Sequence, residues 1–434
     1  MPKPSAIEVV AETETNQADN SRRRFLNRMA QLTAGGVGGI IANQVNASTP
    51  GSVEYAVPKD PTKVQGREPS LDKGYGTRSQ FETETRLHLS APNKQVSVSF
   101  TPLENSRGII TPSGLHFERH YAGIPTIDPN EHQLFIYGLV DSPQKFSIDA
   151  LKRFPSQTRT HFIECSGNSY SEWRKPTKQS VQETHGLTSC SEWTGVLLST
   201  VLKELGVKKN ASWMLAQGRD ASSLIRSIPI EKVWDDAMLV YAQNGEAIRP
   251  EQGYPLRLLL PGFEGNTNVK WLHSLKFTDQ PMLSRWETSH YSDLYEDGKS
   301  RLFSLTMDAK SVITFPSAGM HLDKTGFYEI TGLAWTGQGR VKSVEVSVDD
   351  GKTWQKAMLQ TPLLPNCHTR FRLPWEWNGE LAVIQSRCID ETGYVQPTVT
   401  QLIAERGLNS FYHQNGIQSW VIDKDGYVSN THRT

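Results

Sequence analysis

Cysteine is scarce in this chain: there are four in 434 residues, and none lies in a Cys-x-x-Cys or Cys-x-x-Cys-His arrangement. Zinc ribbons and covalently attached c-type haem need that spacing, so the sequence argues against both in this chain. Cys367 and Cys388 could form a disulfide in an oxidising compartment, and the sequence leaves open whether they pair.

An excess of charge is also absent, because 46 basic residues balance 46 acidic ones. A global attraction to nucleic acid or to anionic lipid is therefore not implied, and any site for a polyanion must be a local cluster. No segment is long and apolar enough to span a membrane comfortably. A hydrophobic content of 37% supports ordinary cores, and the length favours two or three domains.

The N-terminus has the layout of an export signal. Three arginines followed by Phe-Leu occupy residues 22–26, and a mildly apolar, glycine-rich run follows over residues 29–42. Residues 45–47 then offer small side chains at the positions that a signal peptidase reads. The paired arginines mark the twin-arginine type, so we expect residues 1–47 to be a twin-arginine signal and the protein to reside in the periplasm. Such export carries folded proteins, which suggests a cofactor loaded beforehand; a basic arm before a chance apolar run is the alternative.

The rest of the chain divides into three parts. Residues 48–100 are rich in Pro, Gly, Ser and charge without a sustained period, which indicates a linker or an extended arm. Residues 101–300 mix strand and helix patterns: Gln133–Val140 is strand-like, and Thr194–Leu205 has apolar residues at helical spacing. This middle part is predicted to be an α+β region.

Residues 301–425 read as an all-β domain. Tyr328–Trp335 and Val341–Val348 alternate as strands do, and Asp349–Lys352 predicts a tight hairpin turn. Val395–Val399 adds a further short strand, and helical signals are nearly absent. The pattern predicts an immunoglobulin-like β-sandwich.

The first chemical motif is an apolar strand that ends in Cys165 and is followed at once by Ser-Gly-Asn-Ser. A thiolate at a strand end is presented from the loop, and thiolate is a soft ligand suited to a polarizable transition metal. From this segment alone, a half-buried structural cysteine is as good an interpretation as a metal ligand.

The surroundings favour the ligand. The Cys165 segment resembles the cysteine motif of the sulfite oxidase family of molybdenum enzymes, and other matches follow in the family's order from about residue 110 to 420. Thr111–Tyr121 looks like the stretch that meets the pterin and supplies an active-site arginine, and Ser191–Val196 like the segment of the substrate-pocket tryptophan. Asn244–Arg257 and Gly265–Leu272 look like the pterin-binding stretches.

The resemblance implies a role for each matching residue. The implied metal ligand is Cys165, and the implied cofactor contacts are Phe117, His120, Tyr121, Asp220, Gln252, Arg257, Asn268, Val269 and Lys270. The implied catalytic residues are Arg119, Trp193, Tyr291, Arg340 and Arg406. Arg257 suits the pterin phosphate through bidentate donation, and Lys270 suits it as a point charge.

The family's chemistry and architecture follow as expectations. A molybdopterin-binding catalytic domain would occupy residues 101–300, and an immunoglobulin-like dimerisation domain residues 301–425. In this family the molybdenum–molybdopterin cofactor transfers an oxygen atom to a nucleophilic sulfur, and water restores it. With no haem motif here, electrons would pass to another chain, a c-type cytochrome. A homodimer through the β domain is the default.

Two departures bear on the substrate. Tyr170 stands five residues after Cys165, where the vertebrate-type pattern has an arginine, and Arg174 is only a speculative replacement. Tyr121 stands where the family commonly has histidine. Both weaken the case for free sulfite, and the leader with the Phe-Glu-Arg-His stretch looks closest to the molybdenum subunit of the bacterial Sox sulfane dehydrogenase. There the substrate is sulfane sulfur carried on a cysteine of a sulfur-carrier protein.

Three alternatives stay open. A periplasmic sulfite dehydrogenase would use the same residues. A nitrate reductase is a weaker alternative, because that branch carries haem and flavin domains that are not visible here. A non-enzymatic secreted protein would use its β-sandwich for binding and Cys165 as a structural residue.

Overall fold

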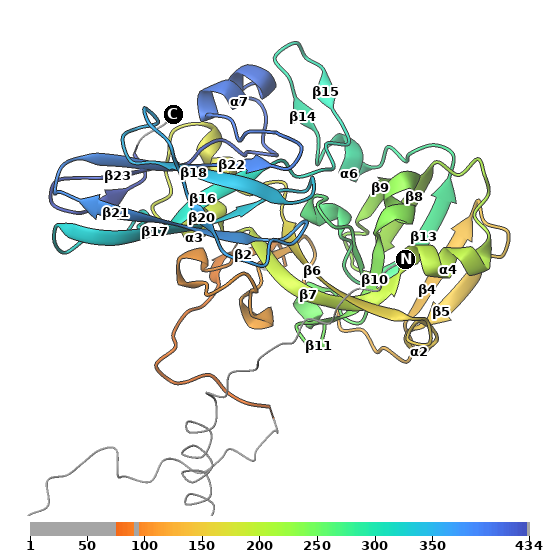
Figure 1. Ribbon diagram of the computed structural model, residues 1–434. Coiled ribbons are helices and arrows are strands. Elements are labelled where there is room, and N and C mark those ends of the chain that lie inside the picture. Colours follow the sequence, from red (N-terminus) through yellow and green to blue (C-terminus); the bar gives the residue numbers. More distant parts are fainter. Residues whose placement is uncertain (1–74, 91–94, 432–434) are drawn as a thin grey trace, which may run out of the picture. The chain divides into compact units, whose positions relative to one another are not determined.

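The computed structural model describes residues 75–90 and 95–431, and Figure 1 traces them as a coloured ribbon. The predicted export signal and most of the predicted arm lie outside these residues. From Arg78 onward the chain forms one compact unit. None of the helices in the described part is both long enough and apolar enough to cross a membrane.

The end of the predicted arm forms a small sheet of its own. Strands β1 (Leu87–Ser90), β2 (Ser97–Phe100) and β3 (Glu118–His120) pair antiparallel in that order. Alternate side chains explain the sheet's packing, because Leu87, Leu89 and Val98 face the apolar cluster that also holds Cys165. The end of the arm therefore packs against the region around Cys165 that the sequence predicts to be functional.

The middle region is α+β, as expected, and contains two five-stranded sheets. The first has the order β11-β10-β7-β6 with β12 beside β10: β6 (Ser156–Glu164), β7 (Thr188–Leu197), β10 (Met238–Gln243), β11 (Glu246–Ala247) and β12 (Arg257–Leu259). The second has the order β5-β4-β13-β8-β9: β4 (Gln133–Gly138), β5 (Gln144–Ser147), β8 (Trp213–Gly218), β9 (Ile225–Pro229) and β13 (Leu272–Thr278).

Short helices and turns connect these strands. The α-helices are α2 (Ile148–Leu151), α3 (Val181–His185), α4 (Leu198–Leu205), α5 (Ile230–Asp235) and α6 (Arg285–Thr288). The 3-10 turns are η2 (Leu103–Asn105), η3 (Ser113–Leu115), η4 (Tyr170–Trp173), η5 (Pro250–Gln252) and η6 (Gly265–Thr267), and the hairpin of β14 (Asp293–Leu294) with β15 (Ser300–Arg301) follows.

The helix predicted over Thr194–Leu205 is only half right. Its first part, Thr194–Leu197, is the end of β7 and pairs with both β6 and β10. Helix α4 begins at Leu198 and ends before Gly206, where the backbone takes a positive φ of 67°. Partners distant in the sequence override the helical spacing of the apolar residues in the first part.

The last region is a β-sandwich of two sheets (Figure 1). One sheet has the order β16-β17-β21-β20: β16 (Lys310–Phe315), β17 (Gly326–Trp335), β20 (Met358–Leu359) and β21 (Thr369–Trp377). The other has the order β19-β18-β22-β23-β24: β18 (Val341–Ser347), β19 (Gln355–Lys356), β22 (Ala382–Asp390), β23 (Ser419–Ile422) and β24 (Val428–Ser429). The strand predicted at Val395–Val399 is wrong, because helix α7 (Val399–Arg406) begins there with a Thr398 capping box.

The sandwich core continues into the α+β region. Phe162, Val181 and Cys190 belong to the same buried cluster as the sandwich residues. All four cysteines are free thiols. Cys367 lies beside Cys190, within hydrogen-bonding contact, and the bond that Cys367 and Cys388 could have formed is absent.

Candidate active site around Cys165

A cavity reaches Cys165 and gathers most of the residues that the sequence predicts for the site. The predicted residues that line it are Phe117, Arg119, His120, Tyr121, Cys165, Asp220, Gln252, Arg257, Asn268, Lys270 and Tyr291. They come from segments far apart in the sequence, and the hydrogen bond between Tyr121 and Tyr291 joins residues 170 positions apart. The fold therefore assembles in one place what the sequence shows only as an ordered series of motifs.

Cys165 stands at the first position after β6, in a loop held by backbone bonds. Its N–H donates to the carbonyl of Leu187 at 2.9 Å, and its own carbonyl accepts from the N–H of Asn168 at 2.8 Å. Burial raises the pKa of the Cys165 thiol, while a contact to Gly167 and the charge of Arg119 oppose that shift. A metal ion would deprotonate it outright.

Another part of the cavity holds two buried cations, Arg257 and Lys270. Burial lowers the pKa of Lys270 well below its ordinary value and that of Arg257 to about 9. Arg257 donates to the carbonyls of Gln252 at 2.9 Å and Asn268 at 3.2 Å, while its Nε is buried with no partner. Cations with depressed pKa values and a spare donor are what an anionic group would stabilise, so this end fits the pterin phosphate.

Other unpartnered polar atoms extend this fit. His116 Nε2, Asp220 Oδ1 and Asn266 Oδ1 are buried without a hydrogen-bond partner, and all three residues line the cavity. Such orphaned atoms cost free energy unless a ligand satisfies them. A heterocycle rich in donors and acceptors, as molybdopterin is, would do so.

Gly265 allows turn η6 to lie close to the loop that carries Cys165. A Cβ at this position would lie 2.9 Å from the carbonyl oxygen of Glu164 and 3.3 Å from the N of Cys165. Only glycine lets turn η6 pack this closely, and η6 lines the cavity through Gly265 and Asn266.

A group of phenols lies on the Cys165 side. The hydroxyls of Tyr121 and Tyr291 are 2.9 Å apart, and the Arg119 guanidinium lies 4.0 Å from the centre of the Tyr121 ring. Burial raises the pKa of Tyr291 well above its ordinary value of 10.0, so its phenol is a neutral hydrogen-bond donor. Tyr291 has a φ of 50°, a conformation that costs side-chain-bearing residues free energy and is concentrated at functional sites.

The structure also supplies functional residues that the sequence did not indicate. Arg226 is completely buried, binds the carboxylates of Glu264 and Glu287, and lies 4.8 Å under the Tyr291 ring. The ring of Tyr412 lies 5.4 Å from that of Tyr291. Arg226 has no motif around it, and Tyr412 is far along the chain, so no local signal could have found them.

Two predicted residues support the cavity from behind. Trp193 is fully buried and does not line the cavity, but the Arg257 guanidinium lies 5.0 Å from its ring centre. Its Nε1 donates to the carbonyl of His161 at 3.1 Å. Val269 is a core residue at 1% exposure, and its carbonyl accepts from the N–H of Leu258 at 2.9 Å.

Three arginines do not reach the cavity. Arg340 has a half-exposed side chain and pairs with Glu391 at 3.8 Å. Arg406 is buried, but its partner is Asp308 at 3.2 Å. Arg174, the speculative replacement for the missing pocket arginine, is exposed and lines none of the cavities around Cys165. None of the three lines the cavity that the resemblance implied for Arg340 and Arg406.

Comparisons with known proteins show the family to which this fold belongs. Residues 121–286 match the oxidoreductase molybdopterin binding domain, and residues 301–420 match the Mo-co oxidoreductase dimerisation domain. The crystal structure of the sulfane dehydrogenase SoxCD from Paracoccus pantotrophus is similar, with 44% identity, a TM-score of 0.82, and coverage of 86% of this chain and 99% of that one.

Curated relatives are more distant. Mitochondrial sulfite oxidase of Mus musculus is 28% identical over 341 residues, which are 72% of this chain and 62% of the mouse protein. Nitrate reductase [NADH] 2 of Phaseolus vulgaris is 29% identical over 351 residues, which are 71% of this chain and 38% of the plant protein. The chain thus spans less than two thirds of the length of either relative.

The chain is a molybdopterin-dependent oxidoreductase by fold and site. It belongs to the sulfite oxidase family, with the molybdopterin domain followed by the dimerisation domain, and its cofactor is molybdenum–molybdopterin.

Proposed function

We propose that this protein is a periplasmic molybdenum oxidoreductase that oxidises sulfane sulfur carried on a cysteine of a carrier protein. The observation that carries the proposal is the character of the cavity mouth next to Cys165. Aromatic side chains line this mouth, and Arg119 is the sole arginine or lysine among the described residues that line it.

Two aromatic side chains form the mouth. The rings of Tyr170 and Phe411 stack with their centres 5.2 Å apart and their planes at 24°, and the two residues are 39% and 48% exposed. Phe411 also packs against Gly167, where a Cβ would lie 3.3 Å from its ring. An apolar mouth offers little to a small dianion in water, whereas it suits a sulfur delivered on a peptide, whose chain supplies contacts of its own.

The residues around the cavity have separable roles. When bound, the cofactor supplies a two-electron oxidation in which an oxygen atom derived from water is added to sulfur. Cys165 would hold the metal, and Arg119 would attract the negative charge of the incoming sulfur group. Tyr291 would donate its hydroxyl hydrogen to an oxygen of the reacting sulfur group and stabilise the negative charge that develops there. Tyr121 donates its own hydroxyl hydrogen to the Tyr291 oxygen, which leaves the Tyr291 hydrogen free to be donated and fixes its direction.

The partners follow from the same proposal. Electrons leave to a c-type cytochrome on another chain, and the similarity to the sulfane dehydrogenase SoxCD supports this part of the proposal. The domain matched over residues 301–420 supports a homodimer. The paired arginines at residues 22–24 support export by the twin-arginine route.

Steady-state reduction of cytochrome c by the holoenzyme tests the proposal. The two substrates are a carrier-type peptide whose single cysteine bears a sulfane sulfur, and free sulfite. We expect a higher kcat/KM for the peptide. Rapid oxidation of sulfite with no turnover of the peptide would overturn the proposal and establish the alternative, a sulfite dehydrogenase with the same residues.

A further inference from the structure

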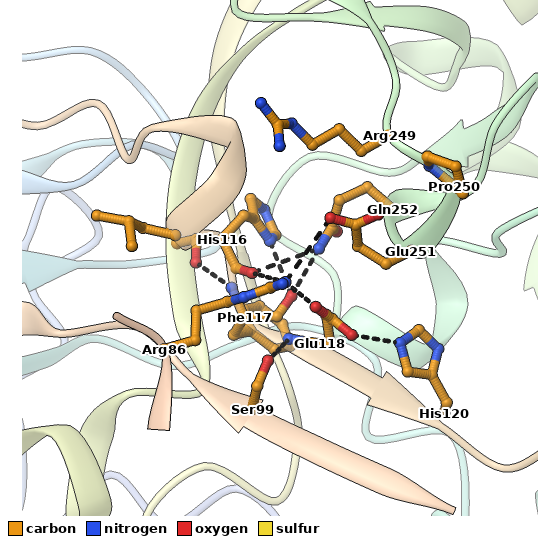
Figure 2. Close-up of polar contacts among 12 residues, drawn as sticks. Arg86, Ser99, His116, Phe117, Glu118, His120, Arg249, Pro250, Glu251 and Gln252 are labelled. Carbon is orange, nitrogen blue, oxygen red and sulfur yellow. Dashed lines mark hydrogen bonds and ion pairs between the residues drawn. The ribbon is translucent and has the colours of Figure 1, made fainter. Parts of the chain in front are cut away.

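A chain of polar contacts runs from the N-terminal arm to the cationic end of the cavity. Arg86, just before β1, forms an ion pair with Glu118 on β3. Glu118 Oε2 lies 2.8 Å from His120 Nε2, and His120 Nδ1 lies 3.0 Å from Lys270 Nζ. Figure 2 shows Arg86, Glu118 and His120 following one another in this order.

When an anion lies beside Lys270 and keeps it charged, the donors and acceptors in this chain allow one arrangement of protons. The ammonium then has hydrogens to donate and no lone pair, so His120 Nδ1 accepts from it. His120 Nε2 then carries the hydrogen and donates it to Glu118. Burial, with the nearby charges of Lys270 and Arg119, lowers the pKa of His120 to about 2, which keeps the ring neutral as this arrangement requires.

His120 completes the hold on the lysine. The Lys270 ammonium also donates to the carbonyls of Arg119 at 3.1 Å and Glu251 at 3.0 Å. With His120 as the third acceptor, all three of its hydrogens have partners and its position is fixed. Lys270 thus acts toward an anion as a charge held in place.

The same chain contains an electrostatic problem that Arg86 solves. The Glu118 carboxylate is 7% exposed, and His120 links it to Lys270 at the end of the cavity that fits the pterin phosphate. Arg86 neutralises it, lies 3.9 Å from the Glu251 carboxylate, and donates to the carbonyl of His116 at 3.3 Å. Strand β1 places Arg86 there, because Leu87 pairs with Phe100 at the end of β2.

We propose that Arg86 and Glu118 are positioning residues for the molybdopterin cofactor. Glu118 fixes the tautomer of His120, which holds the Lys270 ammonium, and Arg86 cancels the Glu118 charge that would otherwise repel the cofactor's phosphate. The end of the arm is therefore part of the cofactor site. This inference rests on the family's cofactor and is independent of the sulfur substrate.

Three variants of the full-length holoprotein distinguish the effect of the Glu118 charge from the effect of its hydrogen bond with His120. Arg86→Met leaves the carboxylate uncompensated, whereas Glu118→Gln keeps an acceptor for His120 Nε2 and removes the charge. The double variant restores neutrality. Arg107→Gln is the control, because that arginine is 85% exposed and lies 3.8 Å from Glu82.

The readout is the rate at which molybdenum and pterin leave the protein during mild warming, with thermal unfolding of the cofactor-free protein measured in parallel. We expect Arg86→Met to lose cofactor about tenfold faster than the parent. Glu118→Gln, the double variant and Arg107→Gln are expected to stay close to it. Arg86→Lys, which keeps the charge, covers the case in which Arg86→Met does not fold, and is expected to retain cofactor. Parental retention by Arg86→Met, or loss from the double variant as fast as from Arg86→Met, would overturn the inference.

Discussion

Glu164 and Lys310 form a fully buried ion pair, with 3.1 Å between Oε1 and Nζ. Glu164 is the residue before Cys165, and Lys310 begins the first strand of the β-sandwich. The second carboxylate oxygen accepts from Trp335 Nε1 at 2.6 Å, also from the sandwich. The cysteine loop is thus anchored to the dimerisation domain, and that domain has a direct part in holding the active site.

Removal of the lysine should be costly. Lys310→Met leaves the Glu164 carboxylate buried without its counter-charge, and the free energy of unfolding should fall by about 3–5 kcal/mol. Denaturant unfolding of the cofactor-free protein measures this. The double variant Lys310→Met with Glu164→Gln should recover a large part of the loss. Equal stability of the single variant and the parent would show that the pair does not hold the two regions together.

Tyr291→Phe should lower kcat on the order of 100-fold, because it removes the donor while keeping the ring between Arg226 and Tyr412. Tyr394→Phe is the matched control, since that hydroxyl bonds Asn415 away from the cavity. Steady-state kinetics with either sulfur substrate measures the effect. An unchanged kcat would remove Tyr291 from the mechanism.

The raised pKa of Tyr291 also predicts how stability and activity depend on pH. A pKa raised above the unfolded value means that the neutral phenol is the stable form in the folded protein. Its contribution to stability is fully present below pH 10.0 and is lost as the pH rises through the raised folded pKa. The activity should therefore show no decline from ionisation of Tyr291 up to that pH. A titration of the parent against Tyr291→Phe checks this, and a decline near neutral pH seen only in the parent would contradict it.

Tyr170→Arg should shift the substrate preference of the enzyme toward free sulfite. The new cation gives a small anion a charge-assisted hydrogen bond and breaks the stacking on Phe411, so kcat/KM for free sulfite should rise about tenfold. The peptide-borne substrate should lose efficiency in the same variant. Arg174→Gln should change neither rate, because Arg174 does not line the cavity. A gain for both substrates, or for neither, would separate substrate choice from Tyr170.

The sequence predicted the parts of the site that are held in motifs. Cys165, Arg257 and Lys270 each lie within a short ordered segment, and the fold places all three around one cavity. Arg340 and Arg406 lie in matches of only two and three residues, Gly339-Arg340 and Glu405-Arg406-Gly407, which is too little to specify a position in space. Arg226 and Tyr412 act through contacts across the fold, so no local pattern could reveal them.

The fold likewise divides into elements that a local sequence pattern predicts and elements that depend on partners distant in the sequence. Alternation at Tyr328–Trp335 correctly predicted β17, since a half-buried strand imposes that period on its own sequence. The end of β7 was read as helix because Val196 and Leu197 fit both periods, and only pairing with β10 decides between them. The end of the arm gave no period, because β1 and β2 are only four residues each and β2 gains its second partner, β3, from outside the arm.

The central claim is that Cys165 binds molybdenum within a pterin site, and X-ray absorption at the molybdenum edge tests it most directly. The measurement compares the parent holoprotein with Cys165→Ser, and Cys388→Ser serves as the control because that thiol is buried in β22. The account predicts one sulfur ligand fewer in Cys165→Ser and an unchanged spectrum in Cys388→Ser. The same number of sulfur ligands in Cys165→Ser and the parent would contradict it.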